Sequence, residues 1–293
     1  MKFKIGIDFG GTKIKVALVK GKDIIRKIKM PTEAKKGKKK ILNNLFTCID
    51  FIIQGIKKSD VECIGIGVPG TLDAKRESVL NLPNIPKFKN VHLKKMIQKR
   101  YKIKVIMDND TNVFAWGEFL YGAGRGYNNL IFLTIGTGLG GGIIINKKLY
   151  HGRGNAAELG HITIKADGTK CVCGNRGCLE EYVSTRAIAK SSKKIFGKSL
   201  HPLKIEQMGK KGNLKAKKVY RILGEYLGIG LATINNIFDP DAIIIGGSIS
   251  NAGYLILKPA KEVMKKNTML KPTKIIKSKL KENAGLIGAA NLS

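Results

Sequence analysis

Acidic residues, aromatic residues and long apolar runs are all scarce in this sequence. Among its 293 residues, 21 are Asp or Glu and only 6% are Phe, Trp or Tyr. No run of about 18 apolar residues occurs, and no apolar signal segment follows Met1. The sequence therefore predicts a cytoplasmic protein without a membrane partner, in a reducing compartment where clustered cysteines favour metal over disulfides.

Arginine is also rare within a strongly basic composition. Lys and Arg number 54 and the formal net charge is +33, yet only eight of these residues are Arg. Arginine forks make the bidentate base contacts typical of nucleic-acid readers. A lysine excess spread along the chain instead indicates a solvated surface, so we expect no specific nucleic-acid partner. A net field of this sign still attracts anionic ligands such as nucleotides.

Apolar periodicity predicts an α/β fold. With 43% hydrophobic residues the chain can bury a sizeable core. Strands are predicted at 2–8, 14–19, 24–30, 63–68, 103–107, 130–135, 139–146, 242–245 and 274–276. Helices are predicted at 38–57, 91–101, 213–237 and 284–291, after residue 247, and from the 108–111 segment to about 120. Two halves that each open with strand, glycine turn and strand predict duplicated lobes with a cleft between them. We expect the stretches 35–40 and 193–217 to be solvated surface.

A glycine-rich turn follows a strand in each half. The first turn holds Asp8, Gly10, Gly11, Thr12 and Lys13, and the second holds Gly136, Thr137 and Gly138. Without a Cβ, backbone N–H groups can approach phosphate oxygens closely. Asp8 could hold Mg²⁺, directly or through water. An ordinary hairpin turn or a packing contact is the alternative, but the pairing of two such turns favours phosphate binding.

The segment Asn109-Asp110-Thr111-Asn112 joins a predicted strand to a predicted helix. A carboxylate at this place is well positioned to accept a proton from a hydroxyl group, as phosphoryl transfer requires. Spacing alone favours the alternative that Asp108 or Asp110 is only the N-cap of the helix.

Three cysteines lie within one short loop. Cys171, Cys173 and Cys178 stand on glycine turns, and His161 precedes them by ten residues. A Cys₃His set with no open position is typical of tetrahedral structural zinc. The sequence therefore predicts a structural Zn²⁺ rather than a catalytic one.

Two glutamates flank the predicted zinc loop. Glu158 lies three residues before His161, and Glu180 lies two residues after Cys178. A rigid metal loop would fix both carboxylates, and paired carboxylates can bind the vicinal hydroxyls of a sugar. Two unrelated surface glutamates are the alternative.

Taken together, these motifs resemble the ROK family of sugar kinases and related repressors. They occur in the family's order as Asp8-Phe-Gly-Gly-Thr, Gly67-Val-Pro-Gly70, Asn109-Asp110-Thr-Asn112, Gly136-Thr-Gly138 through Glu158-Leu-Gly-His161, and Cys171-x-Cys-Gly-x-x-Gly-Cys-x-Glu180. The resemblance covers nearly the whole chain and implies the actin-like, RNase H-like, two-lobed ATPase fold. No motif position departs from the family pattern, although the charge of +33 is unusual for a glucokinase-like enzyme.

The resemblance also implies roles for individual residues. Asp110 is expected to be the catalytic base. The expected sugar ligands are Gly70, Asn109, Glu158, His161 and Glu180, and His161 is expected to bind zinc with its other nitrogen. Both glycine turns are expected to hold the phosphates of Mg²⁺-ATP, with Gly246 and Gly247 on the nucleoside side. We expect a homodimer or higher homo-oligomer with discontinuous lobes, 1–112 plus 281–293 and 113–280.

The expected activity is ATP-dependent phosphorylation of a hexose, with glucose at O6 as first choice. Fructose, mannose, N-acetylglucosamine and N-acetylmannosamine stay open as substrates, and polyphosphate stays open as donor. A sugar-responsive repressor is a rival of another class. We disfavour it because Asp8 already belongs to the first phosphate turn, which leaves no room for a preceding helix-turn-helix domain.

Overall fold

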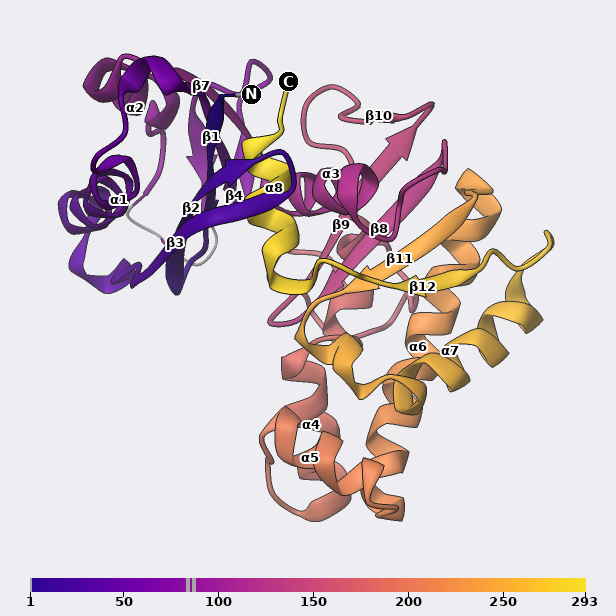
Figure 1. Ribbon diagram of the computed structural model, residues 1–293. Helices are drawn as coiled ribbons and strands as arrows, with labels where there is room; N and C mark the ends of the chain where they lie inside the picture. Colours follow the sequence, from indigo (N-terminus) through magenta and orange to yellow (C-terminus); the bar gives the residue numbers. More distant parts are fainter. Residues whose placement is uncertain (1, 83–84, 86–87) are drawn as a thin grey trace. The chain divides into compact units, whose positions relative to one another are not determined.

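The chain forms two compact units and contains two five-stranded sheets (Figure 1). The computed structural model describes residues 2–82, 85 and 88–293. Unit 1 comprises Met1–Gly126, Gly142–Ala156 and Lys279–Ser293, and unit 2 comprises Tyr127–Gly141 and Ala157–Ser278. The predicted α/β class is confirmed.

The boundaries between these units differ from the expected boundaries at residues 112 and 281. Helix α3 (Asp110–Tyr121) belongs entirely to unit 1 because it packs against α8 (Ala284–Ala290). Gly117 lies against the backbone of Ala284 and Gly288, so the two helices approach too closely for a side chain between them.

The sheet of unit 1 has the strand order β3-β2-β1-β4-β7. Its strands are β1 (Phe3–Phe9), β2 (Lys13–Lys20), β3 (Asp23–Pro31), β4 (Val61–Val68) and β7 (Lys104–Asn109). β1, β2 and β3 form an antiparallel meander, whereas β4 and β7 run parallel to β1. A small hairpin of β5 (Thr71–Leu72) and β6 (Val79–Asn81) follows β4.

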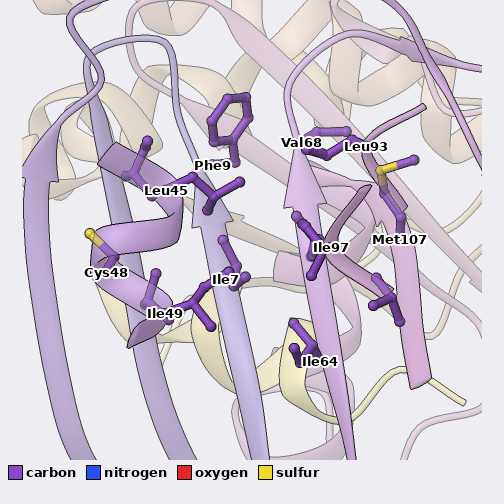
Figure 2. Packing of buried hydrophobic residues seen from close by; sticks show 14 of the residues in the cluster. Ile7, Phe9, Leu45, Cys48, Ile49, Ile64, Val68, Leu93, Ile97 and Met107 are labelled. Carbon is purple, nitrogen blue, oxygen red and sulfur yellow. The ribbon is translucent and has the colours of Figure 1, made fainter. Parts of the chain in front are cut away.

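Helices cover both faces of this sheet. On one face, α1 (Lys38–Ile53) and α2 (Leu93–Tyr101) pack on alternate strand residues such as Ile7 and Ile64 (Figure 2). On the other face, α8 packs against Ala17 and Val19 of β2. Successive strand residues point to opposite faces of the sheet, and helices cover both faces. The residues on both faces are therefore apolar, and each strand is a nearly continuous apolar run in the sequence.

Glycines in the strands let α8 lie directly on the sheet. A Cβ on Gly6 would overlap the carbonyl oxygen of Leu286, and a Cβ on Gly65 would overlap that of Ala289. The last helix of the chain is therefore part of the core of the first unit.

The second sheet has the order β10-β9-β8-β11-β12, and β10 with most of β9 falls in the residues of unit 1. Its strands are β8 (Leu130–Ile135), β9 (Leu139–Ile145), β10 (Lys148–Leu149), β11 (Ala242–Gly246) and β12 (Ile275–Lys277). The chain passes into unit 1 within β9 and returns after Ala156. The helices of unit 2 are α4 (Thr185–Phe196), α5 (Pro202–Lys210), α6 (Leu214–Phe238) and α7 (Tyr254–Asn267).

The expectation that 193–217 is solvated surface holds for most of its residues, which are exposed, but not for all of them. The stretch contains α5 with the ends of α4 and α6, and Ile205 and Ala216 are fully buried. Its abundant lysines mask the few apolar residues that pack inward. Within the described part of the chain, none of the helices has the length and apolar content needed to cross a membrane.

Candidate active site

Three strands of unit 1 bring polar residues to one edge of the sheet. In the parallel register, Asp8 of β1 pairs with Gly67 of β4, and Gly67 pairs with Asp108 of β7. The carboxyl ends of adjacent parallel strands therefore place the first glycine turn and the Asn109-Asp110 segment at the same edge. In α/β sheets this edge is where ligands commonly bind.

The first glycine turn joins β1 to β2. Gly10 N–H donates to the Lys13 carbonyl at 3.0 Å, which closes the turn around Gly11 and Thr12. Thr32 fastens it from outside, since its hydroxyl donates to the Gly10 carbonyl at 2.6 Å. Asp8 forms an ion pair with Lys15, with 2.9 Å between Oδ2 and Nζ.

Asp110 is the first residue of α3. The N-cap is Asn109, whose side-chain oxygen accepts from the Thr111 N–H at 2.8 Å, so neither Asp108 nor Asp110 caps the helix. Asn109 Nδ2 donates to the Gly70 carbonyl at 3.1 Å, which places two of the predicted sugar ligands in contact. At Gly67 a Cβ would overlap Val113, so glycine is needed here for the first turn of α3 to lie against β4.

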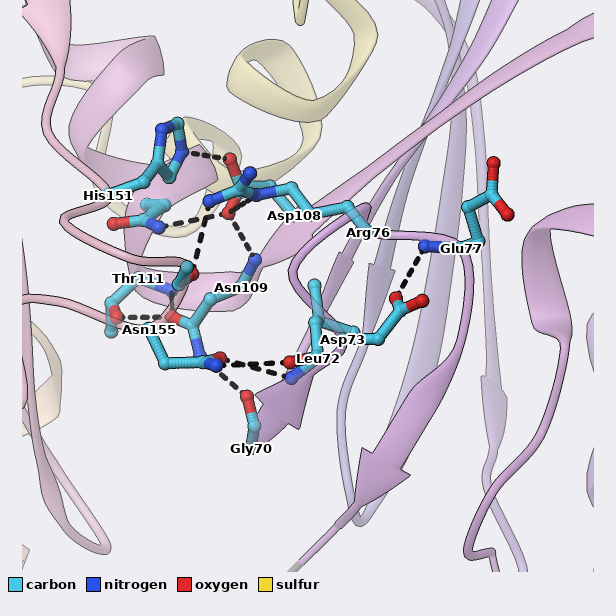
Figure 3. A network of polar contacts seen from close by, with 12 residues as sticks. Gly70, Leu72, Asp73, Arg76, Glu77, Asp108, Asn109, Thr111, His151 and Asn155 are labelled. Carbon is cyan, nitrogen blue, oxygen red and sulfur yellow. Dashed lines mark hydrogen bonds and ion pairs between the residues drawn. The ribbon is translucent and has the colours of Figure 1, made fainter.

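Asp108 is the centre of a polar network that the sequence analysis missed (Figure 3). Its Oδ1 accepts from Asn109 N–H at 2.7 Å and from Asn112 Nδ2 at 2.9 Å. Its Oδ2 bonds with His151 Nε2 at 2.7 Å, and Arg76 Nε lies 3.3 Å from Oδ1.

The surroundings of Asp108 keep it ionised. Only 5% of its side chain is exposed. Burial acts to raise the pKa of Asp108, but the hydrogen bond and charge of His151, with Asn112 and Arg76, outweigh burial and lower the pKa. In the sequence, the one sign of this network was a carboxylate within an apolar strand. Its partners Arg76 and His151 come from distant segments, so the sequence does not indicate them.

The second glycine turn, in unit 2, lies beside Glu180. Gly136 N–H donates to the Gly138 carbonyl at 2.9 Å, and Leu139 N–H donates to Glu180 Oε2 at 2.8 Å. The other carboxylate oxygen of Glu180 accepts from Arg186 at 2.7 Å. A Cβ on Gly138 would overlap the Glu180 carboxylate, so a larger residue here would displace that side chain.

The turn at Gly246 and Gly247, predicted to lie on the nucleoside side, is next to the second glycine turn. Gly246 ends β11, and Gly247 has a φ of 85° just before the short 3₁₀ helix Ser248–Ala252. A Cβ on Gly247 would overlap the carbonyl oxygen of Ile135, and Gly136 lies against Ser248. The two predicted nucleotide turns of unit 2 are therefore neighbours.

His161, Cys171, Cys173 and Cys178 converge in unit 2. Their candidate ligand atoms all lie within 4.8 Å of one another. His161 Nδ1 is 3.7 Å from Cys171 Sγ, and Cys173 Sγ is 3.6 Å from Cys178 Sγ. Tetrahedral Zn–S bonds of about 2.3 Å separate two sulfurs by about 3.8 Å, so the cluster has the dimensions of a zinc site.

Glu158 extends from the same cluster. His161 Nε2 faces Glu158, whose Oε2 lies 3.9 Å away, while Nδ1 faces the cysteines. One imidazole thus has one nitrogen toward the candidate metal ligands and the other toward a carboxylate.

Each unit brings a separate set of the predicted site residues together. Unit 1 gathers Asp8, Gly70, Asn109 and Asp110 at one sheet edge, and unit 2 gathers the second turn, Gly247, Glu180 and the cysteine loop.

A family model matches nearly the whole chain. The model described as "ROK family" matches residues 4–293. The chain belongs to the ROK family. Its two sheet-based units accordingly form the actin-like two-lobed ATPase fold of ROK kinases.

Individual ROK proteins are similar to this chain over most of its length. The glucokinase of Streptomyces coelicolor is 34% identical, with 100% of this chain and 98% of that protein covered. The crystal structure of a ROK glucokinase from Streptomyces griseus with glucose and AMPPNP has a TM-score of 0.87 at 34% identity, covering 99% of both chains. The xylose repressor of Caldicellulosiruptor bescii is 36% identical, with 86% of this chain and 67% of the repressor covered.

Proposed function

We propose that this chain is a sugar kinase that transfers the terminal phosphoryl group of ATP to a hexose, with glucose at O6 as the favoured substrate. The observation that carries the proposal is the placement of Asp110 at the carboxyl end of β7, in the sheet edge that also holds the Asp8 turn. The similarity to glucokinases along the whole chain supports the choice of substrate.

Asp110 acts as the base in this proposal. It takes the proton from the attacking hydroxyl, and a base aimed in this way gives typically 10²- to 10⁴-fold in rate. Asn109 is held by the Gly70 carbonyl and by Thr111, so its amide is fixed for hydrogen bonding to sugar hydroxyls. Glu158, His161 and Glu180 bind further hydroxyl groups of the sugar.

The glycine turns hold the phosphates of ATP. Residues 8–13 and 136–138 offer backbone N–H groups, and Gly246 with Gly247 lies on the nucleoside side. Mg²⁺ bound with the nucleotide supplies positive charge against the transferring phosphoryl group. Asp8, now paired with Lys15, is the carboxylate for that ion.

Zinc has a structural role in this proposal. The three cysteines and His161 Nδ1 form a complete four-ligand set, and the atoms are already close together. Bound Zn²⁺ supplies folding energy. The cysteine loop then holds Glu180, which lies two positions after Cys178, against the second glycine turn.

A coupled assay with a hexose panel, each sugar with ATP and with polyphosphate, tests the activity and the donor. Within that assay, Asp110→Asn lowers kcat at least about 100-fold and leaves the sugar affinity nearly unchanged, because the amide cannot accept the proton. A kcat within a fewfold of wild type would remove Asp110 from this role. Equilibrium sugar binding, measured by calorimetry, is the control for the folded variant.

A sugar-responsive repressor is the second candidate, because xylose repressors are also similar to the chain. Binding to DNA measured against salt separates the two. A sequence-specific complex that a sugar dissociates supports the repressor, whereas weak, unspecific binding that salt abolishes reflects only the excess of lysine.

A further inference from the structure

The network around Asp108 contains polar atoms that stability alone does not explain. Across residues 2–82, 85 and 88–293, the buried side-chain atoms without a hydrogen-bond partner are Arg76 Nε and Asn112 Oδ1. Both residues contact Asp108, and the 3.3 Å approach of Arg76 Nε is an ion pair without hydrogen-bond geometry. An unpaired buried polar atom costs about 1–3 kcal/mol, so its retention calls for a functional reason.

Asp108 fixes the chain on both sides of Asp110. On one side it accepts from the backbone N–H of Asn109, and on the other it accepts from the side chain of Asn112. Asp110 lies between these two anchors at the start of α3. A movement of the Asp108 carboxylate therefore moves the backbone that carries Asp110.

Two further segments of unit 1 are fastened to the same carboxylate. His151 brings the segment after β10, and Arg76 brings the β5–β6 hairpin (Figure 3). These segments are also joined to each other, because Arg76 Nη2 donates to the Gly154 carbonyl at 3.1 Å.

Asn155 adds a second joint between the same two segments. Its side chain accepts from the Leu72 N–H at 3.1 Å and donates to the Leu72 carbonyl at 3.0 Å. Gly70, whose carbonyl holds Asn109, stands two residues before Leu72. The hairpin, the 150–156 segment and the strand end therefore form one hydrogen-bonded frame.

We propose that Asp108, Arg76 and His151 are positioning residues that hold Asn109 and Asp110 in the orientation needed for phosphoryl transfer. The proposal rests on the proposed kinase function. His151 is the member best suited to a test, since its side chain is the most exposed of the three, at 27%.

His92 provides a matched control. It lies in the same unit, and its Nδ1 is 2.6 Å from the hydroxyl of Ser78, a buried residue of the hairpin whose hydroxyl faces His92 rather than Asp108. His92→Ala therefore removes one imidazole and one hydrogen bond to a buried group, as His151→Ala does. In His151→Gln the side-chain amide can still donate to Asp108.

The experiment measures kcat, the KM for sugar and for ATP, and amide hydrogen exchange of residues 109–121. His151→Ala is expected to lower kcat about 10- to 100-fold, because small displacements of a catalytic group have effects of that size. The KM for ATP is expected to stay within about twofold, His151→Gln to recover much of kcat, and His92→Ala to match wild type. Exchange at the start of α3 is expected to be faster in His151→Ala alone.

The two proposals fail separately. If wild type is active and His151→Ala behaves like His92→Ala in both kcat and exchange, the positioning role is wrong and the kinase function stands. If wild type phosphorylates no hexose, the kinase function is wrong, and the exchange comparison still shows whether His151 orders the start of α3. Equal acceleration of exchange in both variants would show that the network only stabilises the fold, and would contradict the positioning role.

Discussion

A buried carboxylate persists in a protein only where its neighbours supply charge and hydrogen bonds. Asp108 has both, since it accepts from Asn109 and Asn112 and lies beside His151 and Arg76. Removing one partner of such a buried pair typically costs about 3–5 kcal/mol. The contribution of Asp108 to the free energy of unfolding should therefore depend on pH.

The lowered pKa of Asp108 predicts a loss of stability in acid. The carboxylate stabilises the folded state above its unfolded pKa of about 3.9, and this contribution is lost as the pH falls through the lower, folded pKa. Asp108→Asn should therefore be destabilised by about 3 kcal/mol at pH 6 and by progressively less below pH 4. Urea unfolding between pH 3 and pH 6 measures the difference.

Asp23→Asn is the control for this titration. Asp23 is exposed at the start of β3 in the same unit, so the free energy of unfolding of Asp23→Asn should stay close to that of wild type over the whole range. A difference between wild type and Asp108→Asn that does not shrink in acid would contradict the assignment of an ionised, stabilised Asp108.

At the scale of elements, the contact between α3 and α8 depends on glycines. A Cβ on Gly288 would overlap the Val113 carbonyl oxygen, whereas a Cβ on Gly285 in the same helix meets nothing closer than Asp8 at 3.7 Å. Gly288→Ala should therefore lower the free energy of unfolding by at least about 1–3 kcal/mol. Gly285→Ala should be neutral or stabilising by up to about 1 kcal/mol, because alanine favours helix.

Chemical denaturation of both variants tests this pair. Equal stability of Gly288→Ala and Gly285→Ala would mean that α8 can move away from α3 without loss, contrary to the close packing of the two backbones.

The proposed zinc site predicts that the stability of the cysteine loop depends on a metal. Cys178→Ser should remove the bound zinc and lower Tm by roughly 10 °C, since a structural zinc site contributes folding energy outright. Elemental analysis gives the metal content, and thermal unfolding gives Tm. Cys63→Ser is the control, because Cys63 lies in unit 1 outside the cluster and should leave one zinc per chain.

A cysteine variant that kept one equivalent of zinc and an unchanged Tm would contradict the metal site. So would wild-type protein that contains no metal after purification without chelators.

Elements with strong periodicity were predictable from the sequence, and long-range polar contacts were not. The strand at 130–135 and the helix at 284–291 match β8 and α8 within one residue, because their apolar spacing is unbroken. The α5 helix was missed, since lysine is frequent on its exposed face. The glycine turns and the cysteine cluster were predicted because each is local in sequence.

The frame around Asp108 illustrates what local patterns leave out. Nothing near Arg76 or His151 in the sequence indicates a contact with Asp108, because strand pairing and loop closure bring the three segments together. The N-cap was similarly ambiguous between Asp108 and Asp110, and hydrogen-bond geometry assigns it to Asn109 instead. The boundaries of the units also depended on packing, which placed α3 with α8.

The net charge of +33 acts at the scale of the whole molecule. A field of this sign should draw the polyanionic nucleotide and leave a neutral hexose unaffected. We expect the KM for ATP to rise several-fold between 0.05 M and 0.5 M KCl, because the screening length falls from above 10 Å to about 4 Å. The KM for the hexose should change little.

Steady-state kinetics at a series of salt concentrations, with magnesium in constant excess, measure both constants. A parallel rise of both would point to a general effect of salt on the enzyme, and would contradict long-range attraction of the nucleotide.

The position of α8 has a consequence for biosynthesis. The ribosome completes the first strands of unit 1 early, but Ala284–Ala290, which covers their second face, emerges only after all of unit 2. At 5–20 residues per second the delay is about 13–53 s. Throughout that interval the nascent chain exposes Ala17 and Val19, the residues that Leu286 later covers, and so offers chaperones a transient binding surface.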